Sequence, residues 1–117
     1  MKKSDIKALI DQMTLEEKVS LLTGANAWST VEIPRLGIPS INLSDGPHGL
    51  RRCDGLGWGE SVPATCFPPA VLLACSFDEE LAKKQGMALG EEAQAQDVQI
   101  VLGPANNIKR SPLGGRC

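Results

Sequence analysis

The sequence predicts an α/β fold with a parallel sheet, and two observations lead to this prediction. Two short apolar runs, Ser40 to Leu43 and Val98 to Leu102, have the composition of buried strands. Between them lies a helix-forming stretch from about residue 76 to about residue 96. A strand, a crossover helix and a second strand form a βαβ unit, in which the two strands run parallel.

Two helices are expected before the first strand. Ser4 can cap a first helix, whose apolar residues recur at helical spacing: Ile6, Leu9, Ile10 and Met13. Thr14 and Glu17 then have the spacing of a capping box, which opens a second helix. Gly24 is the expected end of that helix. We expect an extended connection over residues 25–39, because its prolines and glycine exclude a regular helix.

The first strand should end at Asp45, and a second group of elements follows a long loop. Proline is favoured in the first turn of a helix, so the Phe-Pro-Pro step at residues 67–69 predicts a short helix from Ala70 to Ala74. Ser76 and Glu79 have capping-box spacing and predict the start of the crossover helix. Gly-Pro at residues 103–104 ends the second strand.

Residues 1–117 are expected to belong to one domain. The chain has 117 residues, of which 42% are hydrophobic and 22% are charged, and this composition is typical of globular proteins. A closed (β/α)8 barrel takes about 250 residues, and two strands do not close a sheet. We therefore expect the incomplete N-terminal part of a TIM-like barrel, truncated in the loop after its second strand.

Composition and charge argue against several function classes. Twelve basic and fourteen acidic residues give a net charge of −2 without a basic stripe, so no nucleic-acid partner is expected. No apolar run is long enough for a membrane span, and charged residues interrupt any signal-peptide core. The single histidine and the absence of C-x-x-C predict no metal site. We expect reduced thiols and a cytoplasmic location; the cysteines are Cys53, Cys66, Cys75 and Cys117.

Polar side chains gather directly after the first strand, in the sequence SDGPHGLRR at residues 44–52. Functional groups of parallel α/β folds lie at the C-terminal ends of strands, so the loops after both strands should meet. One carboxylate among several cations suits a neutral polyhydroxylated ligand, because the carboxylate accepts from two hydroxyls while a guanidinium donates to another. The residues expected to meet are Asp45, His48, Arg51, Arg52, Lys109, Arg110 and Arg116.

Each of these residues also has a purely structural interpretation. Asp-Gly-Pro is a common turn, in which the Asp45 carboxylate binds backbone amides. His48 could make a buried structural hydrogen bond. Arg51 and Arg52 cannot both face inward if the local chain is extended, so one of them is expected to be a solvated surface charge. The same objection applies to Lys109 and Arg110, each of which could be exposed at the surface. The glycine-rich residues 55–59 lack the spacing of a phosphate-binding loop, so nucleotide binding is not expected.

Four motifs together span nearly the whole chain. They are MTLEEKVSLLTG at residues 13–24, RLGIPSINLSDGPHGLR at 35–51, PATCFPPAVLLACSFDEELAKKQGMALGEEA at 63–93 and VLGPANNIKRSPLGGRC at 101–117. In this order they resemble the N-terminal part of glycoside hydrolase family 3, of the β-glucosidase type. The resemblance implies a (β/α)8-like barrel whose pocket holds the terminal, non-reducing sugar of a β-glycoside. It also implies that Asp45 binds hydroxyls of this sugar, that Arg116 is its partner, and that Arg51 supports the same pocket.

The resemblance implies a retaining β-glucosidase that hydrolyses terminal non-reducing β-D-glycosyl residues of a small β-glycoside or oligosaccharide, without metal or organic cofactor. Retaining glycosidases need two carboxyl groups about 5–5.5 Å apart, and in this family both follow later in the chain. No catalytic residue is therefore expected here, and the helical glutamates should be caps or solvated charges: Glu16, Glu17, Glu79, Glu80, Glu91 and Glu92. The alternative is a catalytically inactive sugar-binding or interaction fragment.

Overall fold

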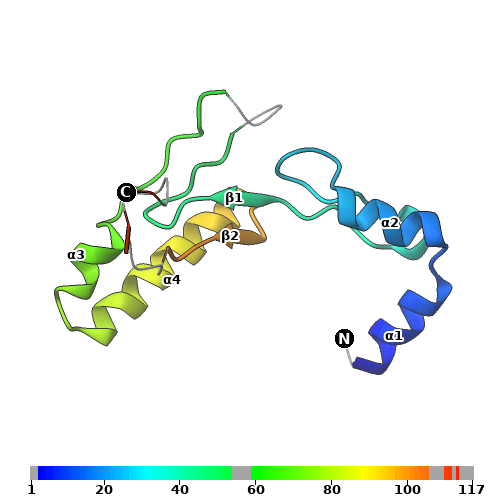
Figure 1. Ribbon diagram of the computed structural model, residues 1–117, viewed down its shortest axis with the longest axis horizontal. Coiled ribbons are helices and arrows are strands. Elements are labelled where there is room, and N and C mark those ends of the chain that lie inside the picture. Colours follow the sequence, from blue (N-terminus) through cyan, green and yellow to red (C-terminus); the bar gives the residue numbers. More distant parts are fainter. Residues whose placement is uncertain (1–2, 54–58, 106–109, 112, 114–117) are drawn as a thin grey trace.

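The computed structural model describes residues 3–53, 59–105, 110–111 and 113 of the chain. The α/β prediction is confirmed for this part, which combines helices with one short parallel sheet. Figure 1 shows α1 and α2 at one end of the molecule, α3 and α4 toward the other, and the two strands near the middle. In chain order the elements are α1 (Lys3–Gln12), α2 (Leu15–Thr23), the 3-10 turn η1 (Pro34–Leu36), β1 (Leu43–Asp45), α3 (Ala70–Ala74), α4 (Glu79–Ala95) and β2 (Ile100–Leu102).

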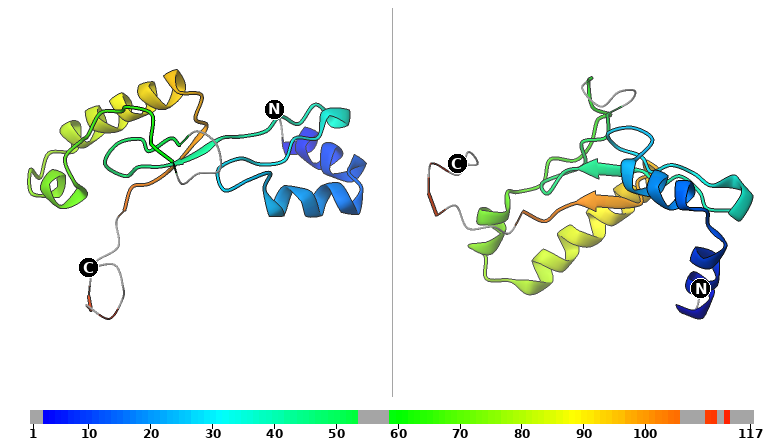
Figure 2. Two further views of the ribbon diagram at one scale, coloured as in Figure 1. Left: turned by 90° about the horizontal axis from the view of Figure 1, so that it is seen from above. Right: turned by 45° about the vertical axis from the view of Figure 1, so that its right-hand side comes forward.

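The two strands pair in parallel, as the βαβ pattern predicts. Leu43 lies opposite Ile100, and Asp45 lies opposite Leu102. Helix α4 leads back to the start of β2 and runs beside both strands (Figures 1 and 2). The C-terminal ends of β1 and β2 therefore lie at the same edge of the sheet, which is where the loop after each strand begins.

A small apolar core lies where α4 meets β2 and the loop after β1. Its buried members are Leu50, Ala93 and Val98, and partly buried apolar side chains pack against them: Ala64, Leu89 and Val101. At the sheet, Ser44 is fully buried and its hydroxyl donates to the Asp45 carbonyl oxygen at 2.8 Å. The core thus joins α4 directly to the chain that follows the first strand.

Polar contacts organise the N-terminal helices. The predicted capping box is confirmed, since the Thr14 amide donates to Glu17 Oε2 at 2.8 Å and the Glu17 amide donates to Thr14 Oγ1 at 3.2 Å. Gly24 ends α2 with a φ of 73°. Arg35 donates through Nε and Nη2 to the Glu17 carboxylate at 3.0 and 2.7 Å, and through Nη2 to the Gln12 carbonyl oxygen at 3.0 Å.

These contacts shift two pKa values. The Arg35 guanidinium and then the Thr14 amide hold the pKa of Glu17 below its ordinary value, because both donate to its ionised form. The Glu17 carboxylate in turn raises the pKa of Arg35. The ionised pair therefore links α2 to η1.

The structure corrects two predicted helix caps. Helix α1 begins at Lys3, so Ser4 lies inside it and its hydroxyl donates to Asp5 Oδ1. Helix α4 begins one residue after Asp78, whose Oδ1 accepts from the Leu81 amide at 3.0 Å, so Asp78 and not Ser76 is the N-cap. Ser76 instead accepts from the Asp78 amide at 3.2 Å, which places its hydroxyl in the turn before the helix.

Both strands begin later than predicted. Strand β1 starts at Leu43 because the Asn42 amide donates to the Gln99 side chain and the Ile41 amide donates to Thr30 Oγ1. Strand β2 starts at Ile100. The connection over residues 25–39 is not wholly extended, since it contains the turn η1.

Candidate functional site

Asp45 and Arg51 lie beside each other at the C-terminal end of β1. After Asp45 the chain turns back, and the Arg51 amide donates to the Asp45 carbonyl oxygen at 2.9 Å. Arg51 Nη1 lies 3.9 Å from Asp45 Oδ2, and the two side chains keep 51% and 46% of their surface exposed. The predicted proximity of this carboxylate and this guanidinium is confirmed, and both retain surface that a ligand could contact.

Two glycines make this turn possible. Gly46 has a φ of 133°, and a Cβ atom there would lie 1.9 Å from the Gly49 carbonyl oxygen. Gly49 has a φ of 141°, and a Cβ atom there would lie 2.1 Å from the Thr65 carbonyl oxygen. A residue with a side chain at either position would have a strained backbone, and its Cβ atom would overlap a backbone carbonyl oxygen. Glycine is therefore required at both positions of SDGPHGLRR, because the chain after Asp45 folds back closely onto itself and onto the segment at Thr65.

The loops after the two strands touch, as the parallel arrangement predicts. Gly103, the residue after β2, is so close to the first loop that a Cβ atom there would lie 3.0 Å from Pro47 Cα. Arg110, further along the second loop, is exposed. Lys109 and Arg116, which were also expected at this edge, lie outside the described residues.

Arg52 does not join Asp45 and Arg51, which corrects the expectation for the full cluster. Its Nη1 atom donates to the Gln96 carbonyl oxygen at the end of α4. Neighbouring side chains of an extended segment point to opposite sides, so Arg51 and Arg52 diverge as the structural interpretation required. Arg52 thus connects the segment after the turn to the end of α4, and Arg51 is the arginine that lies beside Asp45.

His48 contributes its backbone to the site. Its carbonyl oxygen accepts from the Phe67 amide at 2.6 Å. Its side-chain Nδ1 is buried and has no hydrogen-bond partner among the described residues. The expected structural hydrogen bond of the ring is therefore not found at Nδ1, and the residue holds the loop through its main chain.

Sequence reasoning missed one residue near this site, Glu92 of α4. Its Oε1 atom accepts from the Thr65 amide at 2.9 Å and from Thr65 Oγ1 at 3.2 Å. Glu92 was expected to be a solvated charge, and this expectation is wrong for it because the side chain is half-buried against the loop. A weak signal existed, since a carboxylate in the last turn of a helix opposes the helix dipole.

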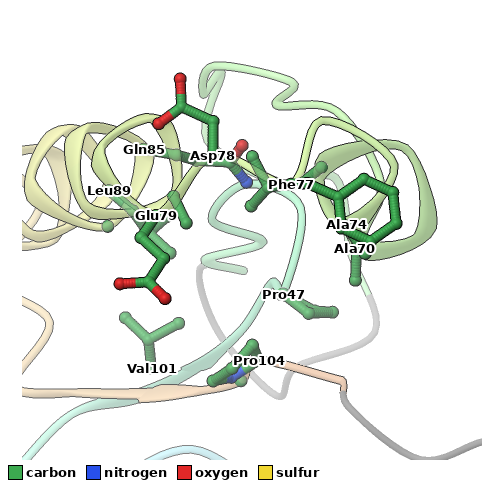
Figure 3. A pocket seen from close by; sticks show the side chains of 14 residues that line it. Pro47, Ala70, Ala74, Phe77, Asp78, Glu79, Gln85, Leu89, Val101 and Pro104 are labelled. Carbon is green, nitrogen blue, oxygen red and sulfur yellow. The ribbon is translucent and has the colours of Figure 1, made fainter.

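A cavity of about 650 Å³ lies beside the loop that carries Asp45 and Arg51, between α3, α4 and the end of β2. Figure 3 shows Val101 and Pro104 on one side of it and the side chains of α3 and α4 across from them. Pro47 reaches this cavity, whereas Asp45 and Arg51 do not line it. Most of the lining is apolar, its charged and polar members are Asp78, Glu79 and Gln85, and the Asp78 carboxylate already caps α4.

The described residues have features that bear on metal binding, thiol pairing and membrane insertion. No group of three or more His, Cys, Asp or Glu side chains there could hold a metal ion. Cys53, Cys66 and Cys75 are free thiols, while Cys117 lies outside the described part. Within the same part, no helix has the length and apolar character that crossing a membrane requires.

The chain is similar in sequence to proteins that are named as glycosidases. No protein-family model matches the chain. It is 58% identical over 116 residues to the thermostable beta-glucosidase B of Acetivibrio thermocellus, a match that covers 96% of this chain and 15% of that relative. It is 50% identical over 113 residues to the exo-alpha-(1->6)-L-arabinopyranosidase of Bifidobacterium longum, with coverage of 92% and 15%.

Solved structures agree with these relatives. The GH3 beta-glucosidase of Bifidobacterium adolescentis superposes with a TM-score of 0.78 at 47% identity, over 92% of this chain and 15% of that chain. The beta-glucosidase of Kluyveromyces marxianus, in complex with glucose, gives a TM-score of 0.83 at 38% identity, over 92% and 13%. The chain thus spans about 15% of the length of the curated relatives that it matches. Its motifs, fold and relatives agree, and the chain belongs to glycoside hydrolase family 3, of the β-glucosidase type, as an N-terminal fragment.

Proposed function

We propose that residues 1–117 form the N-terminal portion of the TIM-like barrel domain of a retaining β-glucosidase, and that this portion supplies part of the sugar-binding pocket. The observation that carries the proposal is the pair Asp45 and Arg51, whose half-exposed side chains meet at the C-terminal end of a parallel strand. This is the edge at which barrel enzymes bind their substrates. The identity of 58% to a protein named as a β-glucosidase supports the same reaction.

In this proposal the pocket binds the terminal, non-reducing sugar. The Asp45 carboxylate accepts hydrogen bonds from two hydroxyls, and the Arg51 guanidinium donates to another. The family resemblance implies that Arg116, which lies outside the described residues, is the partner of Asp45. Each charge-assisted hydrogen bond contributes about 1.5–3 kcal/mol. The Kluyveromyces marxianus enzyme was solved in complex with glucose, which supports a single sugar residue as the ligand of this pocket.

The substrate is a small β-glycoside or oligosaccharide, hydrolysed in the cytoplasm without metal or organic cofactor and without a nucleic-acid or membrane partner. We assign no catalytic residue within residues 1–117, so the nucleophile and the acid/base group come from other segments of the enzyme. The Bifidobacterium longum relative is named for L-arabinopyranosides. An aryl α-L-arabinopyranoside is therefore the second substrate to compare with the aryl β-glucoside.

A chimera tests this proposal. This chain replaces the matched 116 residues of the Acetivibrio thermocellus enzyme, and the hydrolysis of an aryl β-glucoside is measured. We expect the chimera to be active and the isolated chain to be inactive. Asp45→Ala in the chimera should lower kcat and kcat/KM, the latter by at least about 10- to 150-fold, which corresponds to the loss of only one of its two charge-assisted hydrogen bonds.

Asp45→Asn is the control that separates a sugar-binding role from a turn. Asparagine makes the same turn bonds to backbone amides as aspartate. If Asp45 binds sugar, Asn should fail nearly as badly as Ala in a folded chimera. Full kcat/KM in the Asn variant would show that Asp45 is only a turn residue. A folded chimera that binds glucose without hydrolysing the glycoside would favour the inactive sugar-binding fragment.

A further inference from the structure

We propose that Glu92 of α4 is a positioning residue for the loop that carries Asp45 and Arg51. This inference rests on the proposed function, because it assigns a purpose to the site at the end of β1. Glu92 contacts neither site residue. It acts through Thr65, whose amide and hydroxyl both donate to Glu92 Oε1, at 2.9 and 3.2 Å.

The location of Glu92 favours a role outside its own helix. Helix α4 ends at Ala95, so this carboxylate lies in the last turn, where a negative charge opposes the helix dipole. Glu91, the preceding residue, is exposed, whereas Glu92 is half-buried and its Oε2 atom is buried without a hydrogen-bond partner among the described residues. The Glu92 carboxylate lowers the stability of its own helix. The two hydrogen bonds that it accepts from Thr65 explain why a carboxylate lies at this position.

The segment around Thr65 is the support on which the site loop rests. The Thr65 carbonyl oxygen occupies the space that a Cβ atom on Gly49 would need, at 2.1 Å. Two residues later, the Phe67 amide donates to the His48 carbonyl oxygen at 2.6 Å. Gln96, one turn after Glu92, adds a second anchor by donating through Nε2 to the Pro63 carbonyl oxygen at 3.3 Å.

The site loop in turn sets the distance between the two site residues. Its return brings the Arg51 amide to the Asp45 carbonyl oxygen, at 2.9 Å, and the guanidinium to within 3.9 Å of the carboxylate. Displacement of Thr65 would remove the surface against which Gly49 packs and free the chain between Asp45 and Arg51. Glu92 therefore controls the spacing of the site through a continuous path of hydrogen bonds and backbone contacts.

Amide hydrogen exchange on the 117-residue chain tests the path without any sugar. Exchange of the Phe67 and Arg51 amides reports on the site loop. Exchange of the Lys18 amide, which lies in α2 and donates to the Thr14 carbonyl oxygen, reports on the N-terminal helices. We expect Glu92→Ala to accelerate exchange about tenfold or more at Phe67 and Arg51 and to leave Lys18 unchanged. The matched variant Glu91→Ala should change none of the three.

Glu92→Gln and Thr65→Val keep the test independent of any folding defect in Glu92→Ala. Both hydrogen bonds from Thr65 go to a single oxygen of Glu92. Glutamine retains one such acceptor, so it should restore slow exchange. Thr65→Val retains the amide and loses the hydroxyl, so its exchange should be intermediate. Equal acceleration at Lys18 and Arg51, or identical behaviour of the Glu91 and Glu92 variants, would overturn the proposal.

The chimera described above links the path to the site. There we expect Glu92→Ala to lower kcat/KM about tenfold, mainly through KM, with recovery in Glu92→Gln and no change in Glu91→Ala. Unchanged kinetics in a chimera whose Asp45→Asn variant is inactive would refute positioning by Glu92. Full activity of Asp45→Asn together with the expected exchange pattern would instead refute the sugar-binding role and leave the contact path in place.

Discussion

The N-terminal helices and the βαβ part of this chain are held in different ways. In the first region, α2 has no buried residue, although Met13 and Ile33 beside it are buried, and a capping box and the bidentate contact of Arg35 with Glu17 order the helices at the surface. In the second region, Leu50, Ala93 and Val98 form a buried cluster, and two strands pair in register. Exposed ion pairs contribute little free energy, whereas apolar burial contributes about 25 cal/mol per Å². We therefore expect the second region to dominate stability.

The apolar side chains show the same difference. Leu22 in α2 is 87% exposed, although its spacing from the apolar residues Leu15 and Val19 predicts that the three share one face of the helix. Leu50 follows a turn and has no such periodicity, yet it is 5% exposed. Periodicity tells which residues share a face, and only the packing partner decides whether that face is buried.

The largest effect is expected when the core of the second region is truncated. Leu50→Ala should lower the free energy of unfolding by about 2–5 kcal/mol, because it removes buried methyl groups and leaves a cavity beside Ala93 and Val98. Leu22→Ala, which truncates an exposed leucine of the first region, should change it by less than about 0.5 kcal/mol. Urea denaturation of both variants measures the difference. Equal losses would contradict the comparison between the two regions.

A smaller effect is expected when a Cβ atom is added to the turn at the site. Gly49→Ala should cost about 1–3 kcal/mol from its positive φ, at the upper end because the methyl group would overlap the Thr65 carbonyl oxygen. Gly90 in α4 has open space around it, so Gly90→Ala should stabilise the chain by about 1 kcal/mol through higher helix propensity. Thermal midpoints that move in opposite directions would confirm this. Stabilisation by Gly49→Ala would show that Gly49 does not pack against the Thr65 carbonyl oxygen in solution.

The smallest effect is expected in the first region and depends on pH. Because Arg35 and the Thr14 amide lower the pKa of Glu17 on folding, its contribution is present above the ordinary pKa of a glutamate. It is lost as the pH falls through the lowered value. Carbon chemical shifts of Glu17 and helical shifts in α2 should report this loss in a pH titration.

Two variants sharpen the same titration. Glu17→Gln should remove the part of the pH dependence that Glu17 causes. Arg35→Gln should move the midpoint of Glu17 upward, although not fully, since the Thr14 amide still donates to it. A Glu17 midpoint at the ordinary value in the unmodified chain would show that the ion pair is not formed in solution.

Local signals predicted most of the fold. The capping box at Thr14 and Glu17, the end of α2 at Gly24 and the bounds of α3 agree with the structure, because each depends on residues within one helical turn. The cap of α4 was placed wrongly at Ser76. Both Ser76 and Asp78 can cap a helix, but the positive φ of 50° at Phe77 excludes this residue from a right-handed helix that would start at Ser76.

Periodicity and caps predicted the order of the elements and the parallel strands, and the loops expected to meet after the strands predicted the proximity of Asp45 to Arg51. No local pattern predicted that Arg52 contacts α4 or that Glu92 binds Thr65, residues that lie 27 positions apart. The same holds for the exposure of Leu22. The physical reason is range: hydrogen bonds within a turn are specified by neighbouring residues, whereas burial and distant contacts depend on which surfaces pack together.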